Sequence, residues 1–514
     1  MLDSIIKGYP VGTFIFWSTQ ERLRSVRDLG NTPLPEPADG VEVNFVLDGQ
    51  QRLTSLYASL KGLNVTRASG GTDDFSLMYV NLKASEHESI VVTDASTLEA
   101  GSYVKLKTLL DGGLGTLSKF DSSYHTALDE YKTRIESYDF PIVRIQDVEI
   151  DVATEIFSRI NVGGKSLTTF EIMAAKTYDE SRQFDLSSKF DLLVAELATV
   201  EYETVADVSV LQLIALILDG ECNKKAILRL PKSDFIDTWP SAVDSIKMAV
   251  DYFRSTYRIP ASRMLPYNAL LVEFAYFFYK QGQKPDASQS KLLQDYFWRC
   301  ALGARYSSSL ESKLAQDANK IDLILQQKAP DYEWGVDLTP DFILSNGYFR
   351  PTRAFVKAIL CLYAYQIPKS FNDNSVVNIG NGWLKQANSK NYHHFFPRAF
   401  LKKLSIPESY INNVINITIV DDYMNKRLIG AKAPSKYMAD FQNNNPSINE
   451  TMKSHLIGNF KRFGFLKDDY DKFMRERATL VSSELKTRVI ERNIDLRGQV
   501  VRDDDLEEID VVGD

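Results

Sequence analysis

Asn391-Tyr392-His393-His394-Phe395-Phe396-Pro397 contains two of the five histidines of this 514-residue chain, side by side. Two asparagines follow in the runs Ile415-Asn416-Ile417-Thr418 and Met424-Asn425-Lys426-Arg427. A histidine pair with two later asparagines favours a compact metal-dependent nuclease site. We expect a hairpin or loop, a strand over Val414–Val420 and a helix beginning near Asn425, which together make a ββα-metal motif.

Phosphodiester hydrolysis needs a base near neutral pH, a divalent ion and a group that orients the base. His394 is predicted to be the base. His393 points the other way on an extended segment, so His393 and Asn425 are predicted to hold Mg²⁺ or Mn²⁺. Asn416 is expected to hold the His394 ring through a side-chain or backbone bond. The alternative is that both histidines are ordinary surface or packing residues, because short motifs often match by chance.

Basic residues surround the histidine pair and are candidates for phosphate contacts. The strongest candidates for DNA binding are Lys426, Arg427 and Lys432. A solvated basic face would have the same composition, so the pattern leaves both interpretations open.

A second dense motif lies near the N-terminus, Phe45-Val46-Leu47-Asp48-Gly49-Gln50-Gln51-Arg52-Leu53. Residues 41–47 are typical of a strand and residues 51–60 of a helix, and Gly49 permits a sharp turn between them. The helix start is suited to phosphate. Arg52 is predicted to clamp that phosphate, Asp48 to bind a cation or position water, and Gln50 and Gln51 to read a base or sugar. A plain strand–turn–helix is the alternative.

A third motif, Ile156-Phe157-Ser158-Arg159-Ile160-Asn161-Val162-Gly163-Gly164-Lys165, ends a predicted helix. Arg159, Asn161 and Lys165 are candidates for the same nucleotide pocket. A glycine-rich loop with solvated polar residues explains the pattern equally well.

The length and the pattern of elements predict a multidomain α+β protein. Strands and helices mix over 1–180, helices dominate 181–340, residues 341–500 form a further helix-rich domain with the histidine pair, and 501–514 are an acidic tail. Predicted helices of the middle region include residues 208–218, 241–257 and 310–325.

Composition points to a protein of a reducing compartment, which we expect to be cytoplasmic. The three cysteines are far apart without a CxxC pair, and no apolar run approaches membrane-spanning length. No signal peptide is recognisable at the N-terminus. The net charge of −8 counts only mildly against DNA binding, because much of the excess lies in the tail.

Residues 392–437 resemble the HNH (His-Me finger) nuclease domain of GmrSD-type, modification-dependent restriction endonucleases. On that resemblance His394 matches the general base, His393 and Asn425 the metal side, and Asn416 the middle asparagine of the motif. The Asp48–Arg52 motif similarly resembles the ParB/sulfiredoxin-like N-terminal half of the same family. The aromatic-Gln-Arg…Trp element that usually comes first is absent, so we expect either a truncated chain or a shorter variant.

The resemblance implies a DNA endonuclease of an anti-phage restriction system, which binds or hydrolyses a nucleoside triphosphate such as GTP or UTP and senses modified double-stranded DNA. It leaves a homo-oligomer open and implies no membrane partner. The alternative function is a modified-DNA or nucleotide sensor, or an NTPase, whose nuclease-like domain does not cut.

Overall fold

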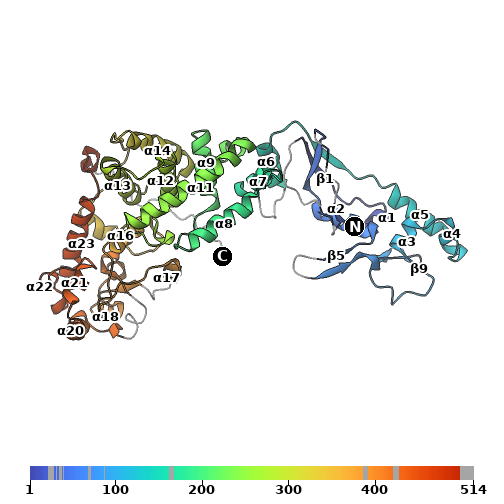
Figure 1. Cartoon of the computed structure of the whole chain (residues 1–514). Coiled ribbons are helices and arrows are strands. Elements are labelled where there is room, and N and C mark those ends of the chain that lie inside the picture. The colour runs from blue at the N-terminus through green and yellow to red at the C-terminus, as the bar shows by residue number, and fades with distance from the viewer. Residues whose placement is uncertain are drawn as a thin grey trace. The chain divides into compact units, whose positions relative to one another are not determined.

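The computed structural model describes residues 1–20, 28–29, 32–33, 37–38, 40–66, 71–85, 87–160, 167–385, 392–420 and 428–497. The chain divides into two compact units, residues 1–178 and 179–514 (Figure 1). The first unit mixes strands and helices, and the second is mainly helical. The protein is therefore α+β, as the sequence predicts.

The strands of the first unit are short and form small sheets. In one sheet β1 lies in the centre, antiparallel to β4 and parallel to β10, and in another β7 lies between β8 and β9. The remaining strands form two-stranded ribbons. The strands are β1 (Phe14–Thr19), β2 (Asp28–Leu29), β3 (Thr32–Pro33), β4 (Val43–Asp48), β5 (Asn64–Thr66), β6 (Thr72–Asp74), β7 (Tyr79–Asn81), β8 (Val91–Val92), β9 (Tyr103–Lys105) and β10 (Ile142–Ile145).

Helices supply much of the apolar core of the first unit. Leu2, Ile5 and Ile6 of the first helix are buried with Val80 of β7 and Leu109 of the third. The described helices are α1 (Leu2–Ile6), α2 (Gln50–Lys61), α3 (Leu106–Asp111), α4 (Leu114–Leu117), α5 (His125–Glu136), α6 (Ile150–Ile160) and α7 (Thr169–Thr177). The predicted strand–turn–helix is confirmed as β4, Gly49 and α2.

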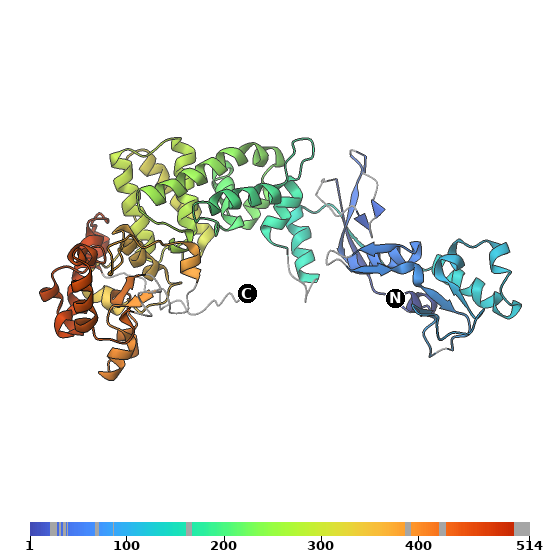
Figure 2. The same ribbon diagram turned by 60° about the horizontal axis from the view of Figure 1, so that its bottom comes forward.

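The second unit begins with a helical bundle. Helices α9, α11, α12 and α14 pack against one another, and they lie side by side in the green and yellow part of both ribbon views (Figures 1 and 2). The helices are α8 (Leu186–Ala198), α9 (Asp207–Leu218), α10 (Lys224–Arg229), α11 (Lys232–Ser255), α12 (Ala269–Gln281), α13 (Ala287–Leu302), α14 (Leu310–Leu325) and α15 (Pro340–Ser345).

Helix α11 begins nine residues before the position that the sequence predicts. It runs from Lys232 and continues through Pro240, although proline removes a helical hydrogen bond. Phe235, Ile236 and Trp239 of the added turns are buried. Burying three large apolar side chains contributes about 1.5–3 kcal/mol each, which is enough to offset about 3 kcal/mol for the proline.

The remainder of the second unit surrounds a two-stranded ribbon of β11 and β12. Helix α16 contacts β12, and α16 and α23 both contact the 3-10 turn before it. The elements are α16 (Ala354–Tyr365), α17 (Asn381–Lys385), β11 (Tyr392–His394), α18 (Arg398–Lys403), α19 (Glu408–Ile411), η4 (Val414–Asn416), β12 (Ile417–Ile419), α20 (Pro434–Asn444), α21 (Ile448–Lys453), α22 (Phe460–Phe463) and α23 (Tyr470–Lys486).

Ion pairs tie residues from both sides of position 340 together. The buried guanidinium of Arg299 on α13 binds both carboxylate oxygens of Asp495, at 2.8 and 2.7 Å, and Arg492 pairs with Asp295 at 3.0 Å. Asp495 also accepts from the backbone N–H of Val336. The segment after α23 is thereby held against the helical bundle.

None of the helices in the described ranges has the length and apolar character required to cross a membrane.

Candidate functional site

The histidine pair lies on the edge of a short antiparallel ribbon. In the register of β11 and β12, His393 is opposite Thr418 and His394 is opposite Ile417. Successive side chains of a strand point to opposite faces, so the two rings enter different environments. His393 is buried at 2% exposure, whereas His394 is partly exposed.

The His394 ring is held in one orientation by Asn412, the residue after α19. Its Nε2 lies 3.0 Å from Asn412 Oδ1, while Asn412 Nδ2 donates to the carbonyl of Phe349 at 3.1 Å. Because the amide nitrogen already faces a carbonyl, the amide oxygen is the atom that faces the ring. Nε2 must therefore carry the proton, which leaves an unprotonated lone pair on Nδ1.

Burial lowers the pKa of His394 to about 4, and Arg398 lowers it further. The hydrogen bond that the ring donates to Asn412 and the charge of Glu408 act in the opposite direction. The imidazole is consequently neutral at pH 7, the state in which a histidine can accept a proton.

His393 faces the interior of the unit. Its Nδ1 lies 2.9 Å from the Thr418 hydroxyl, which itself donates to the His393 carbonyl at 3.3 Å. Nδ1 is therefore the protonated nitrogen. Nε2 is buried beside the rings of Phe371 and Tyr437, and it has no hydrogen-bond partner among the described residues. Burial, together with His394, His455 and Arg477, holds the pKa of His393 well below its usual value.

A neutral imidazole with a free Nε2 has the chemistry of a metal ligand. His393 thus fits its predicted role as far as its own ring is concerned. The second predicted ligand, Asn425, lies outside the described residues. Within the described ranges, no three His, Cys, Asp or Glu side chains come together in a way that could hold a metal ion.

Asn416 is fully buried and holds the backbone that follows His394. Its Oδ1 accepts from the N–H of Phe396 at 2.9 Å, and its Nδ2 donates to the carbonyls of Phe396 and Ile411, both at 3.1 Å. Its own carbonyl accepts from the N–H of Phe395. Asn416 therefore positions the segment after His394, while the bond to the His394 ring comes from Asn412.

The predicted strand over 414–420 is shorter than expected. Val414–Asn416 form the 3-10 turn η4, and only Ile417–Ile419 pair with β11. The reason is Asn413, whose side chain accepts from the N–H of Ile415 and bends the backbone away from an extended path. The predicted helix near Asn425 falls on residues 421–427, outside the described ranges.

Arg477 of α23 secures the ribbon from within the core. Its Nη1 donates to the carbonyls of Ile415 and Ile417, at 2.5 and 2.6 Å, and its Nε and Nη2 donate to the carbonyl of His455. The guanidinium also lies 4.6 Å from the centre of the Tyr363 ring. The backbone on both sides of Asn416 is thereby fixed.

Several of the basic residues near the ribbon have acidic partners. Lys432 pairs with Asp440 at 3.5 Å, and Glu408 binds both Arg398 and Lys402. The other predicted DNA contacts, Lys426 and Arg427, lie outside the described residues.

The Asp48–Arg52 motif of the first unit is bound to its own backbone. Gly49 has φ +91°, the left-handed conformation that glycine allows. Arg52 pairs with Asp48 at 2.8 Å and donates to the carbonyls of Val11 and Thr13, both at 3.0 Å. The guanidinium of Arg52, a predicted phosphate clamp, thus fastens the segment before β1 to α2.

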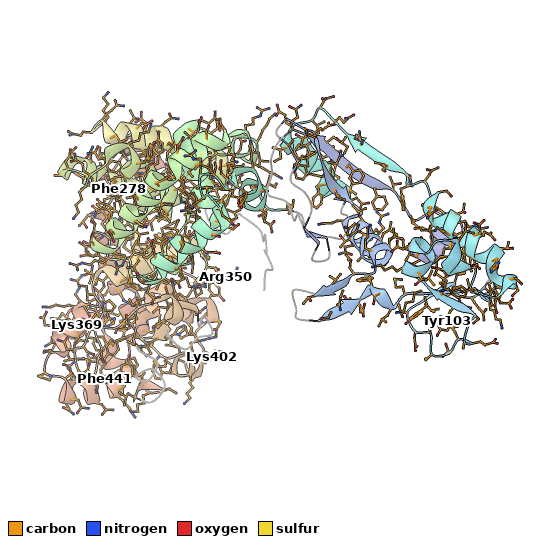
Figure 3. The ribbon with its side chains drawn as sticks, turned by 45° about the vertical axis from the view of Figure 1, so that its right-hand side comes forward. Tyr103, Phe278, Arg350, Lys369, Lys402 and Phe441 are labelled. Carbon is orange, nitrogen blue, oxygen red and sulfur yellow. The ribbon has the colours of Figure 1, made fainter. Side chains whose placement is uncertain are left out.

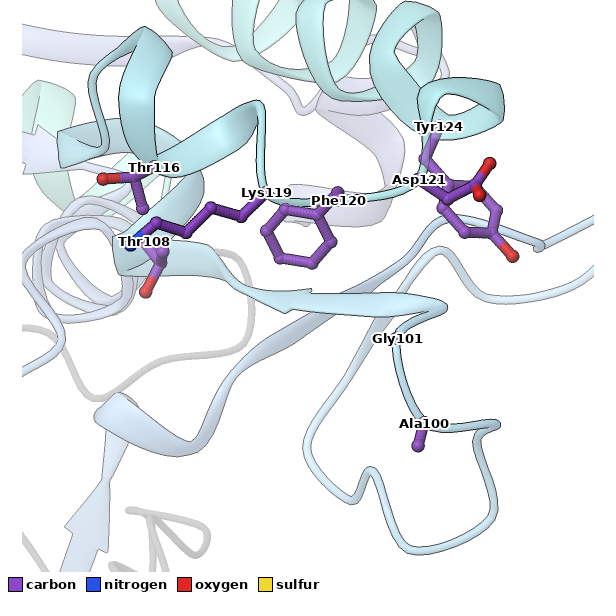
Figure 4. A pocket seen from close by; sticks show the side chains of 8 residues that line it. All are labelled: Ala100, Gly101, Thr108, Thr116, Lys119, Phe120, Asp121 and Tyr124. Carbon is purple, nitrogen blue, oxygen red and sulfur yellow. The ribbon is translucent and has the colours of Figure 1, made fainter.

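The remaining predicted nucleotide contacts are partly described. Gln50 and Gln51 are exposed at the start of α2, and Arg159 is exposed on α6. Asn161 and Lys165 lie outside the described residues. A separate pocket of about 600 Å³ in the first unit is lined by Thr108, Lys119, Phe120 and Tyr124, among others, and by none of the predicted contacts (Figure 4).

Residues 1–178 match the family model of the GmrSD restriction endonuclease N-terminal domain. The same residues form the first compact unit. The first unit of the chain is a GmrSD restriction endonuclease N-terminal domain. An uncharacterized protein of Methanocaldococcus jannaschii is 22% identical over an alignment that covers 93% of this chain and 89% of that protein.

A GmrSD N-terminal domain suggests a GmrSD-like restriction system, whose endonucleases are hydrolases that act on DNA. The match ends at residue 178, so the histidine pair lies outside the part of the chain that identifies the family. The assignment of His393, His394, Asn416 and Asn425 to an HNH site consequently stays a prediction.

Asn412 is the functional candidate that sequence reasoning missed. It stands in Asn412-Asn413 at the C-terminal end of α19, where asparagine is common for purely local reasons. Only the fold brings it beside a histidine 18 positions earlier. In the sequence, only its position four residues before Asn416 could have pointed to it.

Proposed function

We propose that the chain is a metal-dependent DNA endonuclease of a modification-dependent, anti-phage restriction system, in which His394 is the general base. The observation that carries the proposal is the hydrogen bond between His394 Nε2 and Asn412 Oδ1, because it leaves Nδ1 free to accept a proton. In this mechanism Nδ1 takes a proton from water as the water oxygen attacks phosphorus and a P–O ester bond breaks.

Two further features of the ribbon support the proposal. Asn416 and Arg477 hold the backbone around His394, and a fixed base is a requirement for efficient proton transfer. His393 Nε2 and Asn425 would hold Mg²⁺ or Mn²⁺, which supplies positive charge for the phosphate and the leaving oxygen when bound.

The first unit is proposed to gate cleavage by binding or hydrolysing a nucleoside triphosphate, and to sense modified DNA. Gln50 and Gln51 are exposed at the start of the 12-residue helix α2, where backbone N–H groups favour phosphate. Because Arg52 is already bound to Asp48 and two carbonyls, its role in this pocket is to shape the loop around Gly49.

The test is a cleavage assay with the full chain on unmodified, glucosylated, methylated and phosphorothioated plasmids, with Mg²⁺ or Mn²⁺ and with or without each NTP. We expect metal-dependent cleavage of at least one plasmid, lost in EDTA. His394→Ala should reduce the rate by about 10²–10⁴, the contribution typical of a general base.

His87→Ala is the matched control, because His87 is exposed in the first unit. It should cut like the wild type, and circular dichroism should show that both variants are folded. Cleavage by folded His394→Ala at the wild-type rate would refute the assignment. DNA binding without cleavage under every condition would instead favour the sensor with a non-cleaving nuclease fold.

A further inference from the structure

The segment between α15 and α16 lies directly against the candidate site. Its residue Tyr348 forms an antiparallel bridge with Asn413, the N–H of Phe349 donates to the Asn412 carbonyl at 2.8 Å, and the Gly347 carbonyl accepts from Val414 at 2.7 Å. A side chain at Gly347 would come within 2.6 Å of Asn413 Oδ1, so the approach is close.

Phe349 and Asn412 connect this segment to the face of β11 that carries His394. The Phe349 ring packs edge-on against Tyr392 at 4.9 Å between ring centres, and Tyr392 and His394 share one face of the strand. The Phe349 carbonyl and the His394 ring bind opposite ends of the Asn412 side chain. The side-chain amide of Asn412 therefore links the His394 ring to the backbone at Phe349.

Tyr348 and Arg350 flank Phe349, and in an extended segment they share the face opposite to it. Whereas Phe349 is 9% exposed, Tyr348 is 37% exposed and Arg350 is also exposed. The Arg350 guanidinium lies 5.7 Å from the centre of the Tyr348 ring. In the side-chain view Arg350 and Lys402 are on one side of the second unit, and Lys369 is on the other (Figure 3).

The charge of Arg350 is available to a ligand. Among the described residues no acidic side chain pairs with Arg350, in contrast to Arg398 and Lys402, which share Glu408. Arg353 has a different task, because it donates to the Asn346 side chain at 2.9 Å and to the carbonyls of Asn346 and Tyr348. Arg353 fixes the backbone from which Tyr348 and Arg350 project.

We propose that Tyr348 and Arg350 form an arm that binds a DNA strand at the solvent-facing edge of the segment that lies against the candidate site. Arg350 contacts a backbone phosphate, and the Tyr348 ring stacks on the neighbouring base or sugar. An exposed aromatic ring beside an unpaired arginine is the combination that binds nucleic-acid strands. The inference rests on the proposed nuclease function, since it takes the unit that carries His394 as the one that meets DNA.

The experiment measures DNA binding separately from cleavage. Fluorescence anisotropy with labelled duplexes that are unmodified, glucosylated, methylated or phosphorothioated gives Kd at several salt concentrations, in the full chain carrying His394→Ala. Removing one phosphate contact lowers the slope of log K against log salt by about one, so Arg350→Ala should do this and Arg350→Lys should not.

The tyrosine is tested by removing its ring or only its hydroxyl. Tyr348→Ala should weaken binding by about tenfold, a typical cost of losing one stacked base, while Tyr348→Phe should bind like the parent. Lys369→Ala is the control for the loss of a positive charge on the other side of the unit. Its slope of log K against log salt should equal that of the parent chain, which carries only His394→Ala. Thermal melting checks that each variant is folded.

An unchanged salt slope in folded Arg350→Ala, or equal affinities of Tyr348→Ala and the parent, would overturn the arm even if the wild type cuts DNA. A parent that binds no DNA would overturn it as well. If the arm variants behave as expected and the wild type never cuts, the arm stands and the nuclease function fails.

Discussion

Replacing Asn416 with alanine measures how strongly one buried side chain holds the β11–β12 ribbon. Asn416 satisfies the N–H of Phe396 and the carbonyls of Phe396 and Ile411, over distances of 2.9 to 3.1 Å. Alanine leaves these three groups buried without that partner, and each unsatisfied group costs about 1–3 kcal/mol. We expect the free energy of unfolding to fall by about 3 kcal/mol or more.

A loss of this size is a large part of a typical stability of about 5–15 kcal/mol. Urea denaturation of the full chain measures it. Hydrogen–deuterium exchange of peptides from 392–420 shows where it acts, because local opening exposes the amides of the ribbon. Protection should fall most for these peptides, and DNA cleavage should be lost with it.

Asn443→Ala is the matched control, since Asn443 is exposed on α20. An exposed substitution away from special contacts changes stability by about 0.5 kcal/mol or less. If Asn416→Ala were as stable as Asn443→Ala and its ribbon equally protected, the three hydrogen bonds would not hold the site, and the reasoning would be refuted.

Two other substitutions test single contacts. Asn412→Ala removes the acceptor that fixes the His394 ring, so cleavage should fall by about tenfold or more while DNA affinity is retained, and an unchanged rate would exclude Asn412 as a positioning residue. Glu273 is buried, and within the described part of the chain neither of its carboxylate oxygens has a hydrogen-bond partner. Burial and the charge of Asp317 raise its pKa well above 4.5, while Arg305 and Lys320 act in the opposite direction. The folded protein keeps this proton where the unfolded chain loses it. The contribution of the Glu273 proton to the free energy of unfolding is therefore complete below about pH 4.5. Above that pH it falls by about 1.4 kcal/mol per pH unit until the pKa of Glu273 in the folded protein is reached. Glu273→Gln should remove that part of the slope in urea denaturation from about pH 5 to 8, and an unchanged slope would contradict the assignment.

Local patterns in the sequence were sufficient where local interactions decide the structure. The turn at Gly49 and the helix over Leu310–Leu325 follow from glycine chemistry and apolar spacing, and the structure has both. Helix α11 shows the limit, because Pro240 indicates a helix start that the buried rings of Phe235 and Trp239 override. Propensity describes the isolated segment, whereas packing depends on partners that are distant in sequence.

The Asp48–Arg52 motif shows a different limit. Its residues are those that a phosphate site requires, and the sequence gives no means of telling whether Arg52 faces a ligand or the protein. The carbonyls that Arg52 binds belong to Val11 and Thr13, about forty positions earlier. Loss of nucleotide binding in an Arg52 variant would consequently report on loop shape first, and Gln50 or Gln51 would be the better probe of direct contact.

The two histidines acquire different capacities from their partners rather than from their place in the motif. Asn412 and Thr418 both present an oxygen to a ring nitrogen, so each histidine carries its proton toward an acceptor and keeps a lone pair on its other nitrogen. For His394 that lone pair is on Nδ1 of a partly exposed ring, and for His393 it is on a buried Nε2. Burial keeps both adjacent rings uncharged, and His394 further lowers the pKa of His393. A base and a metal ligand both need an unprotonated ring nitrogen, and this ribbon presents such a nitrogen on each of two consecutive residues.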